Sequence, residues 1–109
     1  MGRFLDIVRY VEQPPILCCS GDEDRTTQSL RRRALSRALT AGGDLRVDLT
    51  ELAWADASLM VDLAMVARRV RDAGGGMVIH GAQPHIARLI ELVGLNRMAG
   101  VMVIQPTPA

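Results

Sequence analysis

Apolar and polar residues alternate from Leu45 to Leu49 and then recur at helical spacing in the segment that follows. A period of two is typical of a strand with one buried face, whereas apolar residues three and four positions apart indicate an amphipathic helix. The chain is therefore predicted to contain a strand at Leu45–Leu49 and a helix from about Ser58 to Ala73. The buried stripe of this helix is expected to consist of Leu59, Leu63, Val66 and Val70.

The C-terminal third of the chain contains two short apolar runs and another segment with helical spacing. Short apolar runs over Met77–His80 and Val101–Ile104 are expected to be strands. Between them we expect a helix that begins near Pro84 and ends at Gly94. The residues that this helix is expected to bury are Ile86, Leu89, Ile90 and Val93.

The first half of the chain is predicted to contain two strands and one helix. Phe4–Val11 and Ile16–Ser20 are expected to form a hairpin across two prolines, which a central strand would not tolerate. Gly21 to Asp24 is read as an acidic turn. The helix after this turn is expected to end at Gly42-Gly43. Its apolar stripe consists of Leu30, Ala34, Leu35, Ala38 and Leu39.

The order strand, strand, helix, strand, helix, strand, helix, strand predicts an α/β fold. A chain of 109 residues that is 49% hydrophobic fits one domain with its own core. We assign residues 1–109 to this single domain, with an N-terminal strand within 1–13 and a disordered, proline-containing tail at 105–109.

Charge and cysteine content exclude several classes of function. The 13 basic residues, all arginine, nearly balance 12 acidic ones, so bulk charge indicates neither a nucleic-acid nor a membrane partner. The N-terminal segment is interrupted by charges, so neither a signal peptide nor a membrane span is expected, and the protein is predicted to be cytoplasmic. The adjacent Cys18 and Cys19 are expected to be buried or half-buried thiols. No metal or other cofactor is predicted.

Ser58 lies where the predicted strand passes into the predicted helix. At such a junction the backbone N–H groups are unpaired, and the helix dipole favours negative charge. Two interpretations fit this position. Ser58 or Asp56 caps the helix, as these residue types commonly do, or Ser58 is a phosphorylation site that controls the binding of a partner.

The outward face of the same helix carries a candidate docking surface. Ser58, Asp62 and Arg69 are expected to lie opposite the buried stripe. Val61 and Met65 share that side, and grouped apolar residues on a polar face indicate a binding site. The alternative is that a neighbouring loop covers them.

Several segments from Gly21 onward resemble the STAS domain and, within it, the anti-sigma factor antagonist family. Gly21-Asp22-Glu23-Asp24 resembles the family's G-E-L-D turn. Val47-Asp48-Leu49 and Asp56-Ala57-Ser58-Leu59-Met60 resemble its V-D-L strand and D-S-S-G-L segment. Gly75 to Gly81 and Leu89 to Leu95 are similar to its glycine-then-strand segment and its L-x-x-x-G-L ending. The order and spacing of these segments together carry the resemblance.

The resemblance implies a STAS-like mixed sheet of four to five strands with helices mainly on one face. It also implies that the protein captures an anti-sigma factor, a serine kinase of the histidine-kinase-like ATPase fold, and so releases a sigma factor. Phosphorylation of Ser58 by that kinase would end the capture. We assign the partner-binding surface to Asp24, Asp56, Ser58, Val61, Asp62, Met65 and Arg69. The free protein is expected to be a monomer.

Two positions depart from the family pattern. Ala57 replaces a first serine and removes only a competing hydroxyl. Leu59 replaces the glycine after the phosphoacceptor, and its side chain is expected to restrict the approach of a kinase or the bend of the turn. Leu59 therefore motivates an alternative, a STAS module outside sigma regulation, such as a regulatory subunit docked on a lipid-transporter ATPase.

A catalytic role is not expected. Ser58, His80 and Asp56 are the residue types of a hydrolase triad, but no G-x-S-x-G motif surrounds the serine. His85, early in a predicted helix, is expected at the surface. The protein is therefore predicted not to be an enzyme.

Overall fold

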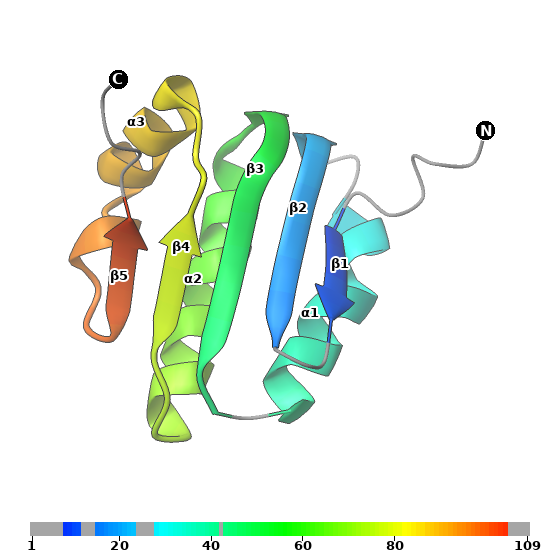
Figure 1. The fold of residues 1–109 in the computed structure, drawn as a ribbon, viewed down its shortest axis with the longest axis vertical. Coiled ribbons are helices and arrows are strands. Elements are labelled where there is room, and N and C mark those ends of the chain that lie inside the picture. Colours follow the sequence, from blue (N-terminus) through cyan, green and yellow to red (C-terminus); the bar gives the residue numbers. More distant parts are fainter. Residues whose placement is uncertain (1–7, 12–14, 24–27, 42, 105–109) are drawn as a thin grey trace.

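The computed structural model of the protein describes residues 8–11, 15–23, 28–41 and 43–104. The elements, in chain order, are β1 (Val8–Val11), β2 (Ile16–Glu23), α1 (Gln28–Ala41), β3 (Leu45–Ala55), α2 (Ala57–Asp72), β4 (Met77–His80), α3 (Pro84–Val93), the 3-10 helix η3 (Leu95–Arg97) and β5 (Val101–Ile104). The predicted alternation of strands and helices is confirmed (Figure 1).

The five strands form one sheet in the order β1-β2-β3-β4-β5. β1 is antiparallel to β2, and the other neighbouring strands are parallel. α1 and α2 lie against the same face of this sheet (Figure 1). The α/β class and the mixed sheet covered on one face are therefore as predicted.

The core lies between the covered face of the sheet and the helices. The predicted stripe of α2 is buried, and Met60 and Ala67 of the same helix join it, all at most 3% exposed. Val47 and Leu49 of β3 and Ile79 of β4 face this stripe from the sheet and are 0% exposed. Removing these aliphatic side chains from water is the main stabilising term of the fold.

The buried stripe of α3 is narrower than predicted. Ile86 and Ile90 are each 1% exposed, but Leu89 is only partly buried and Val93 is 44% exposed. Val93 is the last residue of α3, and the chain leaves the helix at Gly94, whose φ is 81°. The next buried side chain is that of Leu95, after the turn.

β3 runs to Ala55 instead of ending at Leu49 as predicted. Beyond Leu49, its buried residues Leu52 and Ala55 come at every third position. The pairing with β2 shifts twice in this stretch, each time by one residue of β3. Each bulge adds one unpaired residue and so turns the next buried side chain back towards the core. A spacing of three matches neither the strand nor the helix pattern, so the sequence did not reveal this extension.

The acidic turn predicted at Gly21–Asp24 is wrong where the structure describes it. Gly21 to Glu23 continue β2, because the extended β3 offers Leu52, Trp54 and Ala55 as pairing partners. Asp24 lies outside the described residues, as do most of residues 1–13 and the predicted tail at 105–109. Within the described part of β2, Cys19 is buried and Cys18 is half-buried, as predicted.

The turn between α2 and β4 touches the turn between α1 and β3. A Cβ atom on Gly75 would lie 2.5 Å from the carbonyl carbon of Gly43 and 2.9 Å from the amide nitrogen of Asp44. The Asp44 carboxylate accepts a hydrogen bond from the backbone N–H of Gly76 at 2.8 Å. Gly75 is therefore needed because two backbone segments meet there.

Gly75→Ala is expected to lower the free energy of unfolding by about 1–3 kcal/mol, because the two turns must separate to admit a methyl group. Gly76→Ala is the matched control, since the nearest atom to its added Cβ is the Gly100 carbonyl oxygen at 3.4 Å, an ordinary contact. We expect the control to change stability by no more than about 0.5 kcal/mol. Urea denaturation followed by Trp54 fluorescence compares the two variants, and equal losses would contradict the close approach at Gly75.

Candidate functional site

Asp56 caps the N-terminus of α2. Its Oδ1 accepts hydrogen bonds from the backbone N–H of Ser58 at 2.9 Å and from the Ser58 hydroxyl at 2.5 Å. Its extended backbone, with φ −107° and ψ −177°, is that of a residue just before a helix. Of the two residues that the sequence offered as the cap, the structure therefore selects Asp56.

Ser58 is the second residue of α2 and is half-buried. Its hydroxyl lies in the first helical turn, at the positive end of the helix dipole, and is oriented by the Asp56 carboxylate. The neighbouring Leu59 is 0% exposed, so its side chain belongs to the core. Leu59 therefore does not stand on the surface from which an enzyme would reach Ser58.

Asp56→Ala is expected to cost about 1 kcal/mol of stability, because α2 loses the side-chain acceptor for its first turn. Asp56→Asn keeps an acceptor oxygen and is expected to retain most of the wild-type stability. Thermal denaturation of the three proteins provides the comparison. A loss of the same size in both variants would indicate that the charge of Asp56, rather than its cap, is what matters.

Val61 and Met65 lie on the outward face of α2. Val61 is 63% exposed and Met65 is 45% exposed, so no described loop covers them. Asp62 is half-buried and Arg69 exposed beside them. We refer to Ser58, Val61, Asp62, Met65 and Arg69 as the α2 surface.

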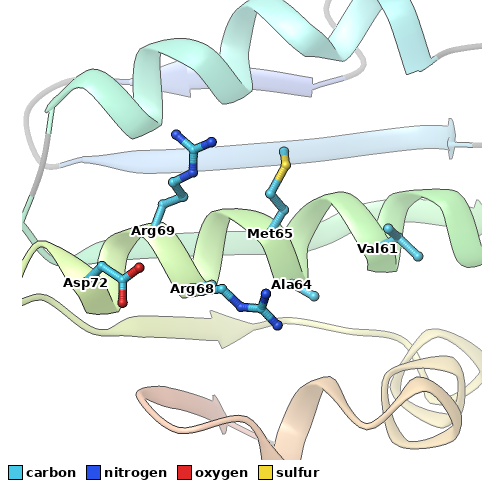
Figure 2. A pocket seen from close by; sticks show the side chains of 6 residues that line it. All are labelled: Val61, Ala64, Met65, Arg68, Arg69 and Asp72. Atoms are coloured by element: carbon cyan, nitrogen blue, oxygen red, sulfur yellow. The ribbon is translucent and has the colours of Figure 1, made fainter.

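Two hollows flank Met65. The first, of about 430 Å³, runs along α2 and is shown in Figure 2. Its lining residues are Val61, Ala64, Met65, Arg68, Arg69 and Asp72. The second, of about 350 Å³, lies between α1 and α2 and is lined by Arg32, Leu35, Ser36, Leu39, Asp62 and Met65. Met65 lines both hollows and therefore stands between them. We refer to the exposed side chains of Val61 and Met65 together as the apolar ridge.

Trp54 is a candidate site residue that the sequence analysis did not assign. It is 47% exposed near the end of β3, two residues before the Asp56 cap. Tryptophan is among the residue types that most often dominate binding energies at protein interfaces. Two features of the sequence could have indicated Trp54: it is the only tryptophan of the chain, and it directly precedes the Ala55–Met60 segment.

The remaining site predictions have different outcomes. Asp24 lies outside the described residues, so its part in binding stays a prediction. His80 pairs in register with Asp48 across β3 and β4. Their neighbours Val47 and Ile79 are buried under the helices, so both side chains lie on the opposite sheet face from α2. The structure therefore does not assemble His80 with Ser58 and Asp56 into a triad.

Asp48 and His85 have structural partners. Burial raises the pKa of Asp48. The hydrogen bonds from the hydroxyl and N–H of Thr50, together with the electrostatic effect of His80 and Arg46, lower it by more, so the pKa of Asp48 lies below its ordinary value. These bonds hold the backbone where β3 bulges. His85 is exposed, as predicted, and its Nε2 donates to the carbonyl oxygen of Ala53 at 2.5 Å.

Within the described part of the chain, no three histidine, cysteine, aspartate or glutamate side chains are grouped so as to hold a metal ion. None of the described helices combines the length and the apolar character needed to cross a membrane. The candidate site is the capped N-terminus of α2 with the exposed Val61 and Met65 that follow along the helix.

Solved structures share this fold. The anti-sigma factor antagonist SpoIIAA in its unphosphorylated form superposes with a TM-score of 0.70 at 16% identity, covering 85% of this chain and 79% of its own. The phosphorylated form, described as a Bacillus cell fate determinant, gives 0.65 at 16% identity, covering 85% and 82%. A protein from Thermotoga maritima, provisionally assigned as an anti-sigma factor antagonist, gives 0.69 at 13% identity, covering 92% and 85%.

Sequence comparison extends the likeness beyond the fold. No curated protein sequence matches the chain. The family profile described as "Mlab, STAS domain", however, matches residues 8–104, which is nearly the whole chain. The protein therefore belongs to the family of STAS domains, as its sequence motifs indicated.

Proposed function

We propose that this STAS domain is a cytoplasmic anti-sigma factor antagonist that binds a kinase-type anti-sigma factor and so releases a sigma factor. The observation that carries the proposal is the position of Ser58. Its hydroxyl is held by Asp56 in the first turn of α2, and the exposed Val61 and Met65 follow along the same helix. SpoIIAA, which has the same fold, is described in phosphorylated and unphosphorylated forms.

In the proposed complex the partner covers the apolar ridge of the α2 surface. Val61 and Met65 would lose most of their exposed area, which favours binding. Asp62 and Arg69 lie beside them and provide a polar rim.

Phosphorylation would act on this interface through charge. The Ser58 Oγ bonds to the γ-phosphorus of ATP, the bond from that phosphorus to the β-phosphate oxygen breaks, ADP leaves, and the hydroxyl proton passes to the solvent. The Asp56 carboxylate accepts the hydrogen bond of that hydroxyl, so it is placed to orient the attacking oxygen. The product carries about −1.5 to −2 charges at neutral pH, adjacent to the Asp56 carboxylate. Binding would then require a hydrated dianion to be buried beside Val61 and Met65, which is unfavourable.

The proposed switch affects binding more than folding. The N-terminal amides of α2 offset part of the repulsion from Asp56, by about 0.3–1 kcal/mol at an exposed site. Ser58 is only half-buried, so the phosphate can extend into water in the free protein. The phosphorylated protein is therefore expected to remain folded and lose its partner.

The proposal is tested by incubating the purified protein with ATP and each kinase-type anti-sigma factor encoded in its own genome. We expect intact-mass measurement to detect one added phosphate, peptide mapping to place it on Ser58, and Ser58→Ala to remove it while retaining the complex. A phosphate elsewhere would reject Ser58 as the acceptor. No phosphate and no complex with any of these kinases would reject the proposed function.

Two observations favour a second candidate function, a STAS module docked on the ATPase subunit of a lipid transporter. Leu59 departs from the glycine of the D-S-S-G-L motif. The matching family profile, in addition, carries a description that does not mention sigma regulation. Co-purification with a transporter ATPase, without any complex with an anti-sigma factor, would support this candidate over the first.

A further inference from the structure

Helices α1 and α2 carry more positive than negative charge, unlike the rest of the chain. α1 and α2 together contain seven arginines and two aspartates, a net charge of +5 (7 − 2), whereas the chain as a whole carries +1. The acidic residues are therefore concentrated in the rest of the chain. Such segregation creates a local positive potential over the helix layer, although the bulk charge is nearly neutral.

The positive charge borders the apolar ridge. Arg68 and Arg69 line the first hollow together with Met65, and Arg32 of α1 lines the second. Figure 2 shows Met65 and Arg69 on the side of α2 that faces α1, with Arg68 on the side away from it. The only carboxylate of the first hollow is Asp72, and Asp62 of the second already takes part in an interaction within the fold.

The spacing along α2 defines the shape of a complementary ligand. Arg69 follows Met65 by four residues and Arg68 follows Val61 by seven, so the apolar and basic residues share one stripe of the helix. From Val61 to Arg69 the stripe spans about 12 Å, eight residues at about 1.5 Å each. A second helix laid along this stripe would meet apolar side chains over about one turn and cations over the next.

We propose that the α2 surface, extended by Arg68 and Arg32, receives an acidic amphipathic helix of the partner protein. Apolar side chains of that helix cover Val61 and Met65, and its carboxylates lie over Arg68 and Arg69. The inference rests on the proposed function and names the chemistry of the partner's contact segment. A nucleic acid fits less well, because the centre of the surface is the exposed thioether of Met65 rather than an aromatic ring.

A first experiment uses two synthetic hydrocarbon-stapled helical peptides as probes. Both carry the same leucine face, and the polar positions at one end are glutamate in one peptide and lysine in the other. We expect the glutamate peptide to bind about tenfold or more tightly than the lysine peptide, because two surface ion pairs change affinity by up to about fivefold each. NMR shifts of the Met65 methyl group report binding at this surface.

Charge-reversed variants locate the effect. Arg68→Glu/Arg69→Glu is expected to abolish the preference for the glutamate peptide. Arg33→Glu/Arg88→Glu changes the net charge equally at exposed positions that line neither hollow, and the preference should persist. Equal affinity for both peptides, or a preference that survives in Arg68→Glu/Arg69→Glu, would overturn the inference. So would binding of an RNA oligonucleotide or an anionic vesicle through these arginines without binding of the glutamate peptide.

The outcomes separate this inference from the proposed function. If an anti-sigma factor binds and Arg68→Glu/Arg69→Glu leaves its affinity unchanged, the acidic helix is rejected and the proposed function stands. If the glutamate peptide binds as expected and no anti-sigma factor does, the acidic-helix site stands and the proposed function is rejected. Raising the salt concentration should weaken the wild-type complex more than the complex of the doubly reversed variant, because exposed charges are screened.

Discussion

Ser58→Asp is expected to weaken binding of the partner anti-sigma factor by at least about a hundredfold, which corresponds to about 3 kcal/mol. The introduced carboxylate would stand in the first turn of α2 beside the Asp56 carboxylate, next to the apolar ridge that the partner covers. Burying it there leaves a charge without compensation. Ser58→Ala removes only a hydroxyl and is expected to bind within a few-fold of the wild type. Isothermal titration calorimetry with the purified partner measures both affinities.

A matched control separates the position of the charge from its presence. Thr40→Asp places the same carboxylate at an exposed position of α1 that lines neither hollow, and it is expected to bind like the wild type. Circular dichroism should show that all three variants remain folded. Equal affinities of Ser58→Ala and Ser58→Asp would refute the switch at this residue.

Leu59→Gly, which restores the glycine of the family motif, is expected to lower the free energy of unfolding by about 3–6 kcal/mol. Of this, about 2–5 kcal/mol comes from emptying a leucine-sized space in the core, and about 1 kcal/mol from placing glycine within a helix. Leu59 is 0% exposed, so the space left by its side chain would be closed to water. Because small domains are stable by only about 5–15 kcal/mol, much of the fold's stability would be lost. Urea denaturation followed by circular dichroism measures the difference.

Ala57→Gly is the control for this variant. Ala57 is exposed at the first position of α2, so the substitution removes helix propensity without opening the core. We expect it to cost no more than about 1 kcal/mol. If Leu59→Gly costs no more than Ala57→Gly, then Leu59 does not contribute to the core, and its departure from the motif needs another explanation.

Local patterns were sufficient for the elements whose packing follows a regular period. The helix at Ser58–Ala73, the strand at Met77–His80 and the strand at Val101–Ile104 were predicted almost to the residue. In each of them, the side that faces the core is set by a repeat of 3.6 or two residues. The same periodicity placed Val61 and Met65 on the outward side of α2.

The C-terminal extensions of β2 and β3 pair with each other, so neither could be predicted from its own segment of the sequence. Gly21 to Glu23 look like a turn unless Leu52 to Ala55 are available as pairing partners. The period of three in that part of β3 makes sense only when two bulges are present in its pairing with β2. Strand pairing is a long-range property, so neither segment reveals it alone.

By itself, the sequence determined the α/β class, the STAS motifs, and the presence of a serine and two apolar residues on one side of α2. Only the tertiary structure decided that Asp56 rather than Ser58 is the cap and that Trp54 is exposed. It also brought Arg32 of α1 beside Met65, 33 positions away (65 − 32). The reason is physical: periodicity depends on neighbours a few residues apart, whereas capping geometry, burial and grooves between helices depend on segments that meet only after the chain has folded.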